Sequence, residues 1–255
     1  MDYKPTDIAL IAGGTSGLGK QTAKILRALG LNVVIAGRCK RKGERASEET
    51  GATFYQMDVC NYESVKNCFE KALSNDFNLR IMLNCAGFLS AKRIISRGEA
   101  HEAKLFAELI NTNLLGALYC ASLAATFIAK SDPIDPDQQR GVIINTSSTA
   151  AFDGQIGQAA YAASKGGINA MTLPMARDLA SYGIRVCTIA PGLFDTPLVS
   201  AVDSKIKLSV RDQTPFPRRF GTPDEFALTV KHIIENTMLN GEIIRLDGGL
   251  RMSIN

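Results

Sequence analysis

Ser148, Tyr161 and Lys165 have the types and the spacing of an acid–base site. Residues at i and i+4 of a helix project from the same face, so the Lys165 ammonium can lie close to the Tyr161 phenol. A phenol titrates near ~10, and a nearby cation favours the phenolate. We therefore expect Lys165 to lower the pKa of Tyr161 and to make this tyrosine a usable general acid or base near neutral pH.

Ser148 ends the run Gly-Val-Ile-Ile-Asn-Thr-Ser-Ser of residues 141–148, which is typical of a buried parallel strand. Open α/β sheets bind their ligands at the carboxyl ends of such strands, so the Ser148 hydroxyl is well placed to contact a substrate. The alternative is a surface helix on which Tyr161 and Lys165 are only neighbours. The Ser148 strand and the glycine loop favour the acid–base site.

The glycine loop is Gly13-Gly14-Thr15-Ser16-Gly17-Leu18-Gly19, between a short apolar run and a helical pattern. Glycines allow positive φ and let a ligand approach the backbone, and the amides at a helix N-terminus bind phosphate oxygens. The spacing is Gly-x-x-x-Gly-x-Gly, which differs from the Gly-x-Gly-x-x-Gly of the common dinucleotide fingerprint. Its place between the first strand and the first helix predicts a nucleotide site.

Strands and helices alternate along the chain without a linker or a repeat. Apolar and β-branched runs predict strands at residues 8–12, 32–36, 53–57, 81–83, 141–148, 185–190 and 242–246. Helical patterns cover residues 17–29, 62–73, 103–129 with a bend or break near Gly116, a segment that contains Tyr161 and runs to about residue 181, and 222–235. Right-handed crossovers then give a parallel sheet covered on both faces. We predict one α/β domain over residues 1–255, a doubly wound Rossmann-type sheet with a dinucleotide-binding half (about 1–150) and a catalytic and lid half (about 151–255).

Composition points to a single core and away from several classes of protein. The chain has 255 residues, 45% of them hydrophobic, and a net charge of +4 without a long basic run, so we predict no nucleic-acid partner. Six cysteines without a Cys-x-x-Cys pair indicate reduced thiols in the cytoplasm or the mitochondrial matrix. Two histidines argue against a metal site, and we expect none. The longest uncharged segment, Leu114–Ala129, is too short for a membrane span, and no signal peptide is evident.

Nearly the whole chain resembles the short-chain dehydrogenase/reductase family, and the resemblance gives each motif a role. It implies that a nicotinamide dinucleotide binds at Gly13, Ser16, Gly17, Leu18 and Gly19 of the loop, at Asp58 and Val59 beside the adenine, at Cys85, Ala86 and Gly87, at Tyr161 and Lys165, and at Pro191, Phe194 and Thr196 beside the nicotinamide. This chain has Ala12 and Cys85 where the family usually has Thr and Asn. Asp58 has an alternative role as a turn cap, and Asn113 as an interior polar group.

The same resemblance assigns the catalytic roles. Tyr161 exchanges the proton with the substrate oxygen, and Lys165 lowers its pKa and holds the nicotinamide ribose. Ser148 binds the substrate oxygen, and Asn113 completes a proton relay to solvent. We also expect Gln155 to contact the substrate, and residues 200–216 to form the lid that selects it.

Within the family, the chain is most similar to the type II 3-hydroxyacyl-CoA dehydrogenases, above all in residues 141–146, 154–161, 189–194 and 241–248. This similarity implies an oxidoreductase for 3-hydroxyacyl or 3-oxoacyl thioesters of CoA. Hydroxysteroid dehydrogenase and 3-oxoacyl-carrier-protein reductase are alternatives of the same class. A cofactor-binding structural or regulatory subunit is the alternative from another class, and the complete Ser148, Tyr161 and Lys165 set argues against it.

Two further expectations concern cofactor and assembly. The second strand ends in Gly37-Arg38 without the acid that binds the ribose hydroxyls in NAD-specific enzymes, and Lys40, Arg41 and Lys42 follow. Arg38 could hold a 2′-phosphate through a bidentate fork, so we expect NADP(H), with NAD(H) as the alternative. Helical segments 114–129 and 168–179 are apolar around most of their circumference, and the resemblance implies that they pair in a homotetramer.

Overall fold

Seven parallel strands form the sheet, in the alternating order that the sequence predicts. The computed structural model describes residues 4–74, 77–197 and 212–253. The strands are β1 (Asp7–Ala12), β2 (Asn32–Gly37), β3 (Thr53–Gln56), β4 (Asn78–Asn84), β7 (Gly141–Thr146), β8 (Ile184–Pro191) and β9 (Ile243–Leu246). Their order across the sheet is β3-β2-β1-β4-β7-β8-β9. The predicted doubly wound α/β fold is confirmed.

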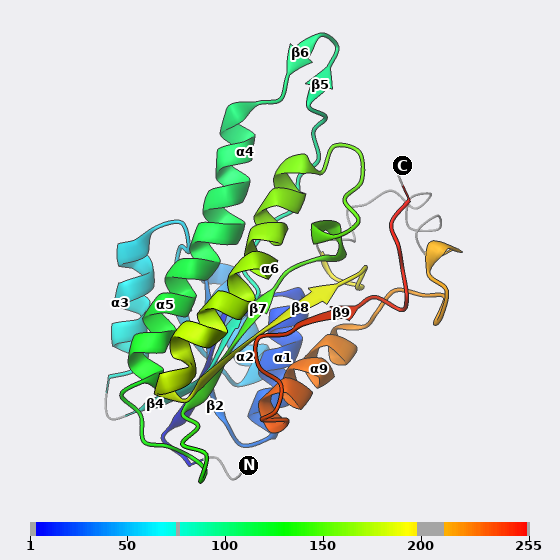
Figure 1. Cartoon of the computed structure of the whole chain (residues 1–255). Helices are drawn as coiled ribbons and strands as arrows, with labels where there is room; N and C mark the ends of the chain where they lie inside the picture. Colours follow the sequence, from blue (N-terminus) through cyan, green and yellow to red (C-terminus); the bar gives the residue numbers. More distant parts are fainter. Residues whose placement is uncertain (1–3, 75–76, 198–211, 254–255) are drawn as a thin grey trace.

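Helices cover both faces of this sheet (Figure 1). One layer contains α3 (Tyr62–Ala72), α4 (Ala103–Leu109), α5 (Gly116–Ile128) and α6 (Ala159–Leu179), and the other contains α1 (Gly17–Ala28), α2 (Lys40–Thr50) and α9 (Pro223–Glu235). Each layer has its own hydrophobic core, with Phe69 buried in the first and Phe226 in the second. Because both faces are covered, the sheet can bind ligands only at its edges and at its carboxyl end.

The helix predicted over residues 103–129 contains a π-helical turn, Ile110–Leu115, between α4 and α5. A break was expected near Gly116, which is the first residue of α5. A Cβ added at Gly116 would lie 2.8 Å from Cγ2 of Val59, so the glycine allows close packing there. Residues 103–128 are long and apolar enough for a membrane crossing, but 56% of the relevant window is buried in the fold, which is typical of a core helix.

Helix α2 and a short hairpin, both within the described residues, were not predicted from the sequence. Helix α2 is nearly all polar and buries only Gly43, Ala46 and Thr50, so its sequence lacks the apolar period that indicates a helix. A short hairpin, β5 (Ile95–Ser96) and β6 (Glu99–Ala100), projects beyond α4 (Figure 1). Of the predicted lid, residues 200–211 lie outside the described residues.

A buried ion pair fixes the segment that leads into β7. The side chains of Arg80 and Asp7 are only 2% and 3% exposed, and Nε of Arg80 donates to Oδ1 of Asp7 at 2.7 Å. Nη1 of Arg80 also donates to the carbonyls of Asp132 and Arg140. These bonds satisfy the buried guanidinium and attach the polar 131–140 segment to the sheet.

Candidate active site

A cavity of about 150 Å³ lies at the carboxyl ends of β4, β7 and β8. It brings together three segments that are far apart in the sequence: the Ser148 loop, the first turns of α6, and the loop after β8. Its walls are formed by Leu18, Cys85, Gly87, Phe88, Leu89, Thr146, Ser147, Ser148, Thr149, Ala150, Gln158, Tyr161, Lys165, Pro191, Gly192, Leu193, Phe194, Thr196 and Met252. We call this space the catalytic cavity.

Ser148 is oriented by the short 3₁₀ turn that follows β7. Its Oγ accepts a hydrogen bond from the amide of Ala150 at 3.1 Å, so Ser148 caps the turn Thr149–Ala151. The Ser148 side chain is also hydrogen-bonded to the Tyr161 phenol. The serine hydroxyl is therefore fixed beside the tyrosine, as the sequence predicted, although β7 ends two residues earlier than expected.

Lys165 lies next to the Tyr161 ring, as the i, i+4 spacing predicts, but burial dominates the titration of both groups. Nζ of Lys165 donates to the carbonyl of Thr146 at 2.8 Å and lies 5.9 Å from the Tyr161 ring centre. Burial raises the pKa of Tyr161, and the hydrogen bond from Ser148 opposes this shift only in part. Burial also lowers the pKa of Lys165 to about 8. The expectation of a lowered Tyr161 pKa is thus wrong, because the effect of burial exceeds that of the hydrogen bond with Ser148.

A phenol with a raised pKa remains protonated at neutral pH. Tyr161 can therefore donate a proton to a developing alkoxide without prior ionisation, while Ser148 stabilises the same oxygen. Lys165, with a pKa of about 8, is mostly cationic at pH 7 and adds positive potential beside the ring. The arrangement suits the reduction of a carbonyl and, in reverse, the oxidation of an alcohol.

Asn113 is buried and uses its side chain to hold neighbouring segments. Its Oδ1 accepts from the amide of Phe88, and its Nδ2 donates to the carbonyl of Phe88, each at 3.0 Å. Nδ2 also contacts Oγ of Ser164 at 3.1 Å. The side chain therefore connects the π-helical turn to the wall of the catalytic cavity and to α6, and does not line the cavity itself.

A second cavity, of about 320 Å³, lies between the glycine loop and the end of β2. We call it the nucleotide cavity. It is lined by Gly13, Thr15, Ser16, Ala36, Gly37, Arg38, Cys39, Lys42, Met57, Val59, Cys85, Ala86, Gly87 and Thr112. Gly13 has a φ of 78°, and a Cβ there would lie 2.6 Å from the amide nitrogen of Ala86. Only glycine allows this contact, so the loop lies directly against the turn after β4.

Cys85 and Gly87 line both cavities, so the two form one elongated site. Helix α1 begins at Gly17 and has no acidic residue in its first turn, which leaves the positive end of its dipole for an anion. A Cβ added at Gly17 would lie 3.4 Å from that of Thr196, so the loop after β8 reaches the glycine loop. The glycine loop, the helix terminus and the continuous cavity fit a dinucleotide.

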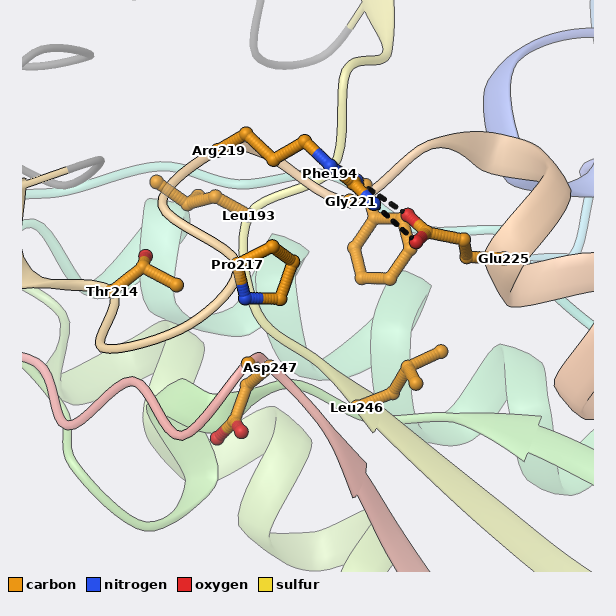
Figure 2. Close-up of a pocket in the computed structure, with 10 residues that line it drawn as sticks. Leu193, Phe194, Thr214, Pro217, Arg219, Gly221, Glu225, Leu246 and Asp247 are labelled. Atoms are coloured by element: carbon orange, nitrogen blue, oxygen red, sulfur yellow. Dashed lines mark hydrogen bonds and ion pairs between the residues drawn. The ribbon is translucent and has the colours of Figure 1, made fainter.

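The loop after β8 packs against the segment around Gly221 and the first turns of α9 (Figure 2). Gly221 donates to the carbonyl of Leu193 and accepts from the amide of Asp195, each at 2.9 Å. The ring of Phe194 packs edge-on against Phe226 at 6.3 Å. A separate pocket of about 240 Å³ lies behind Leu193 and Phe194, and the Arg219–Glu225 ion pair forms part of its wall (Figure 2).

Several predicted site residues lie outside the two cavities. Oδ1 of Asp58 accepts from the amide of Cys60, so Asp58 caps a turn, and it lines a neighbouring groove together with Arg38. Gly19 lies behind the loop, where a Cβ would be 2.6 Å from the carbonyl oxygen of Gly13. Gln155 donates to the carbonyl of Ser253 instead of lining the catalytic cavity.

Some cavity residues had no signal in the sequence. Gln158 lies one residue before α6, and its Oε1 accepts from the amide of Gln155 at 3.1 Å. Leu193 also lines the cavity, between the predicted nicotinamide contacts Pro191 and Phe194. Met252 is close to the end of the chain, and no periodicity or motif could have placed it beside Ser148.

These features define a nicotinamide-dependent oxidoreductase, and comparison with known proteins gives the family. The sequence matches the short chain dehydrogenase family over residues 7–207. The chain belongs to this short-chain dehydrogenase/reductase family and is an enzyme of CH–OH oxidation and carbonyl reduction that uses a nicotinamide dinucleotide.

Its relatives include proteins with one shared name. The chain is 43% identical over 249 residues to 3-hydroxyacyl-CoA dehydrogenase type-2 of Drosophila melanogaster, over 96% of this chain and 97% of the fly protein. It is 45% identical to the protein of the same name from Bos taurus, over 96% and 95% of the two chains. The crystal structure of 3-hydroxyacyl-CoA dehydrogenase type-2 from Mycobacterium avium matches with a TM-score of 0.91 and 38% identity over 98% of each chain.

Proposed function

We propose that the protein interconverts 3-hydroxyacyl and 3-oxoacyl thioesters of CoA. The main support for this proposal is that Ser148, Tyr161 and Lys165 line the same cavity. That cavity is continuous with the nucleotide cavity, which fits a dinucleotide. The choice of substrate rests on the similarity to the proteins named 3-hydroxyacyl-CoA dehydrogenase type-2.

Each residue of the trio has a role in this reaction, and Lys165 would also hold the nicotinamide ribose. A nicotinamide dinucleotide bound in the two cavities would supply or accept the hydride. Oη of Tyr161 donates the proton to the substrate oxygen during reduction and takes it back during oxidation. Oγ of Ser148, held by the amide of Ala150, binds the same oxygen. The Lys165 cation stabilises the phenolate that Tyr161 becomes after donation. Asn113 would complete the proton relay to solvent, and its side chain also connects Phe88 to Ser164.

A substrate panel tests the proposal. Purified enzyme should reduce acetoacetyl-CoA at least as efficiently as it reduces a 3-oxosteroid or a small ketone, measured as kcat/KM from dinucleotide absorbance. Clear turnover of a steroid or another ketone without turnover of acetoacetyl-CoA would reassign the substrate. Absence of turnover with every carbonyl compound would instead favour a structural or regulatory role.

For the cofactor, we propose NADP(H), with NAD(H) as the alternative. Gly37 and Arg38 both line the nucleotide cavity, together with Lys42. A Cβ added at Gly37 would lie 2.9 Å from Cγ2 of Thr15, so the position of a ribose-binding acid is already crowded. The first turn of α2 contains Lys40, Arg41 and Lys42 and no acidic residue. Positive side chains are unfavourable at the positive end of a helix dipole, and a bound 2′-phosphate would offset this repulsion.

We also propose a homotetramer in a reducing compartment, either the cytoplasm or the mitochondrial matrix. Helix α6 lies beside the continuous helix that α4 and α5 form (Figure 1), and Phe106, Leu118 and Leu173 on these helices are 36–44% exposed. Pairing of these helices across a twofold axis would bury this apolar surface, and a second interface would complete the tetramer. Light scattering at micromolar concentration should give four times the mass of the chain, and a monomeric mass would contradict the proposal.

A further inference from the structure

The last residues of the described chain reach the catalytic cavity. After β9, Gly248 and Gly249 have φ values of 63° and 81°, and this left-handed pair turns the chain back towards the site. Met252 then lines the cavity that contains Ser148 and Tyr161. We propose that Met252 is a wall of the substrate site that selects the length of the substrate's alkyl chain.

The tail is held on both sides of Met252. On one side, Leu250 is only 1% exposed, and its carbonyl accepts from Nη2 of Arg245 at 2.9 Å. On the other side, the amide of Ser253 donates to Oε1 of Gln213 at 3.1 Å, and its carbonyl accepts from Nε2 of Gln155 at 3.3 Å. Met252 is therefore attached to the cavity at two points and is not part of a loose end.

Arg245 connects this tail to the segment that follows Ser148. Its Nη2 contacts Oδ2 of Asp153 at 2.6 Å, and its Nε contacts Oδ2 of Asp247 at 2.9 Å. The guanidinium also lies 4.9 Å from the ring centre of Phe152. Asp247 in turn accepts from the amide of Gly249 at 3.0 Å, and its carboxylate points away from the Arg219–Glu225 pair (Figure 2). The tail thus forms one unit with the loop that presents the catalytic serine.

The volume of the catalytic cavity explains how Met252 would select the length of the acyl chain. The catalytic cavity has a volume of about 150 Å³ and joins the nucleotide cavity at Cys85 and Gly87. A volume of about 150 Å³ accommodates a group of roughly the size of benzene. A short acyl chain fits within it, whereas a longer one needs the space that the Met252 side chain fills. Methionine is unbranched and flexible, so it can pack against short chains and yield partly to longer ones. The inference rests on the proposed function, because it takes the substrate to be an acyl thioester.

The experiment compares Met252→Ala with Met252→Phe. We measure kcat/KM for 3-oxodecanoyl-CoA and for acetoacetyl-CoA and take the ratio of the two values. Because one methylene in an apolar pocket changes specificity by about 10–200-fold, Met252→Ala should raise the long-to-short ratio about tenfold or more, and Met252→Phe should lower it. Met238→Ala is the matched control, since Met238 is 91% exposed and its variant should keep the wild-type ratio.

Gln155 is a positioning residue for Met252, because its side chain holds the carbonyl of the neighbouring Ser253. Gln155→Ala should shift the ratio in the same direction as Met252→Ala but by less, because it loosens the tail without removing the wall. Combined with Met252→Ala it should add nothing further. Additive effects would show that Gln155 acts independently of Met252.

Two outcomes separate this inference from the proposed function. If wild type reduces acetoacetyl-CoA and both Met252 variants keep its ratio, the inference is wrong and the function stands. If wild type reduces neither thioester, the proposed function fails, and the same ratio is then measured with a long and a short methyl ketone. A shift in that ratio would uphold the role of Met252, and an unchanged ratio would overturn it.

Discussion

Tyr161→Phe should lose most turnover while it keeps the dinucleotide. The substitution removes the phenol that shares a hydrogen bond with Ser148 and leaves the ring that packs beside Lys165. Because general acid–base groups contribute about 10²–10⁴-fold, we expect kcat to fall by about that factor. The glycine loop and the loop after β8 are unchanged, so the dissociation constant of the dinucleotide should change much less than kcat.

Steady-state rates and a fluorescence titration with reduced dinucleotide measure the two effects separately. Tyr182→Phe is the control, because Tyr182 is 52% exposed and does not line the catalytic cavity. It should behave as wild type. Near-normal kcat in Tyr161→Phe would show that another group donates the proton and would remove Tyr161 from the catalytic role.

Arg38→Leu should abolish the preference for NADPH. Arg38 is exposed at the end of β2 and lines the nucleotide cavity opposite the glycine loop. Hydrogen bonds to charged groups contribute about 1.5–3 kcal/mol, or roughly 10–150-fold in affinity. We therefore expect wild type to favour NADPH over NADH in kcat/KM, and Arg38→Leu to lower the NADPH-to-NADH ratio at least about tenfold, mainly through the KM for NADPH.

Arg41→Leu is a matched control for charge. Arg41 lies in the first turn of α2, three residues after Arg38, and its substitution removes the same charge, but Arg41 does not line the nucleotide cavity. Its effect should be small and should fall further with added salt, because an exposed charge acts at a distance through a screened potential. A wild type that already prefers NADH by tenfold, about 1.4 kcal/mol, would show that NADP(H) is the wrong cofactor.

The alternation of strands and helices could be predicted from sequence because each element has a local signal. Apolar runs such as residues 8–12 and 141–146 form buried strands, and the i, i+4 spacing of Tyr161 and Lys165 places both on one face of α6. Right-handed crossovers then leave few arrangements of the sheet. Helix α2 was missed because its sequence is almost wholly polar and gives no apolar period.

The positions of Ser148, Tyr161 and Lys165 could also be predicted from local signals. The pKa shifts of Tyr161 and Lys165 could not. The i, i+4 rule places a lysine beside a tyrosine, but how far each group is shielded from water depends on every segment that packs around it. Burial raises the pKa of Tyr161 and lowers that of Lys165, which reverses the expected direction for the tyrosine. Desolvation depends on the whole fold, so no spacing in the sequence reveals it.

Local sequence patterns were enough to predict the class of sheet, the Ser148, Tyr161 and Lys165 set, and the glycine loop, since each depends on residues close together in the chain. Tertiary structure decided what closes the site. It placed Met252 beside Ser148, made Gln155 a partner of Ser253, and let Cys85 join the two cavities. The physical reason is that cavity walls are formed where segments distant in sequence pack together, and such packing depends on the shape of the whole core.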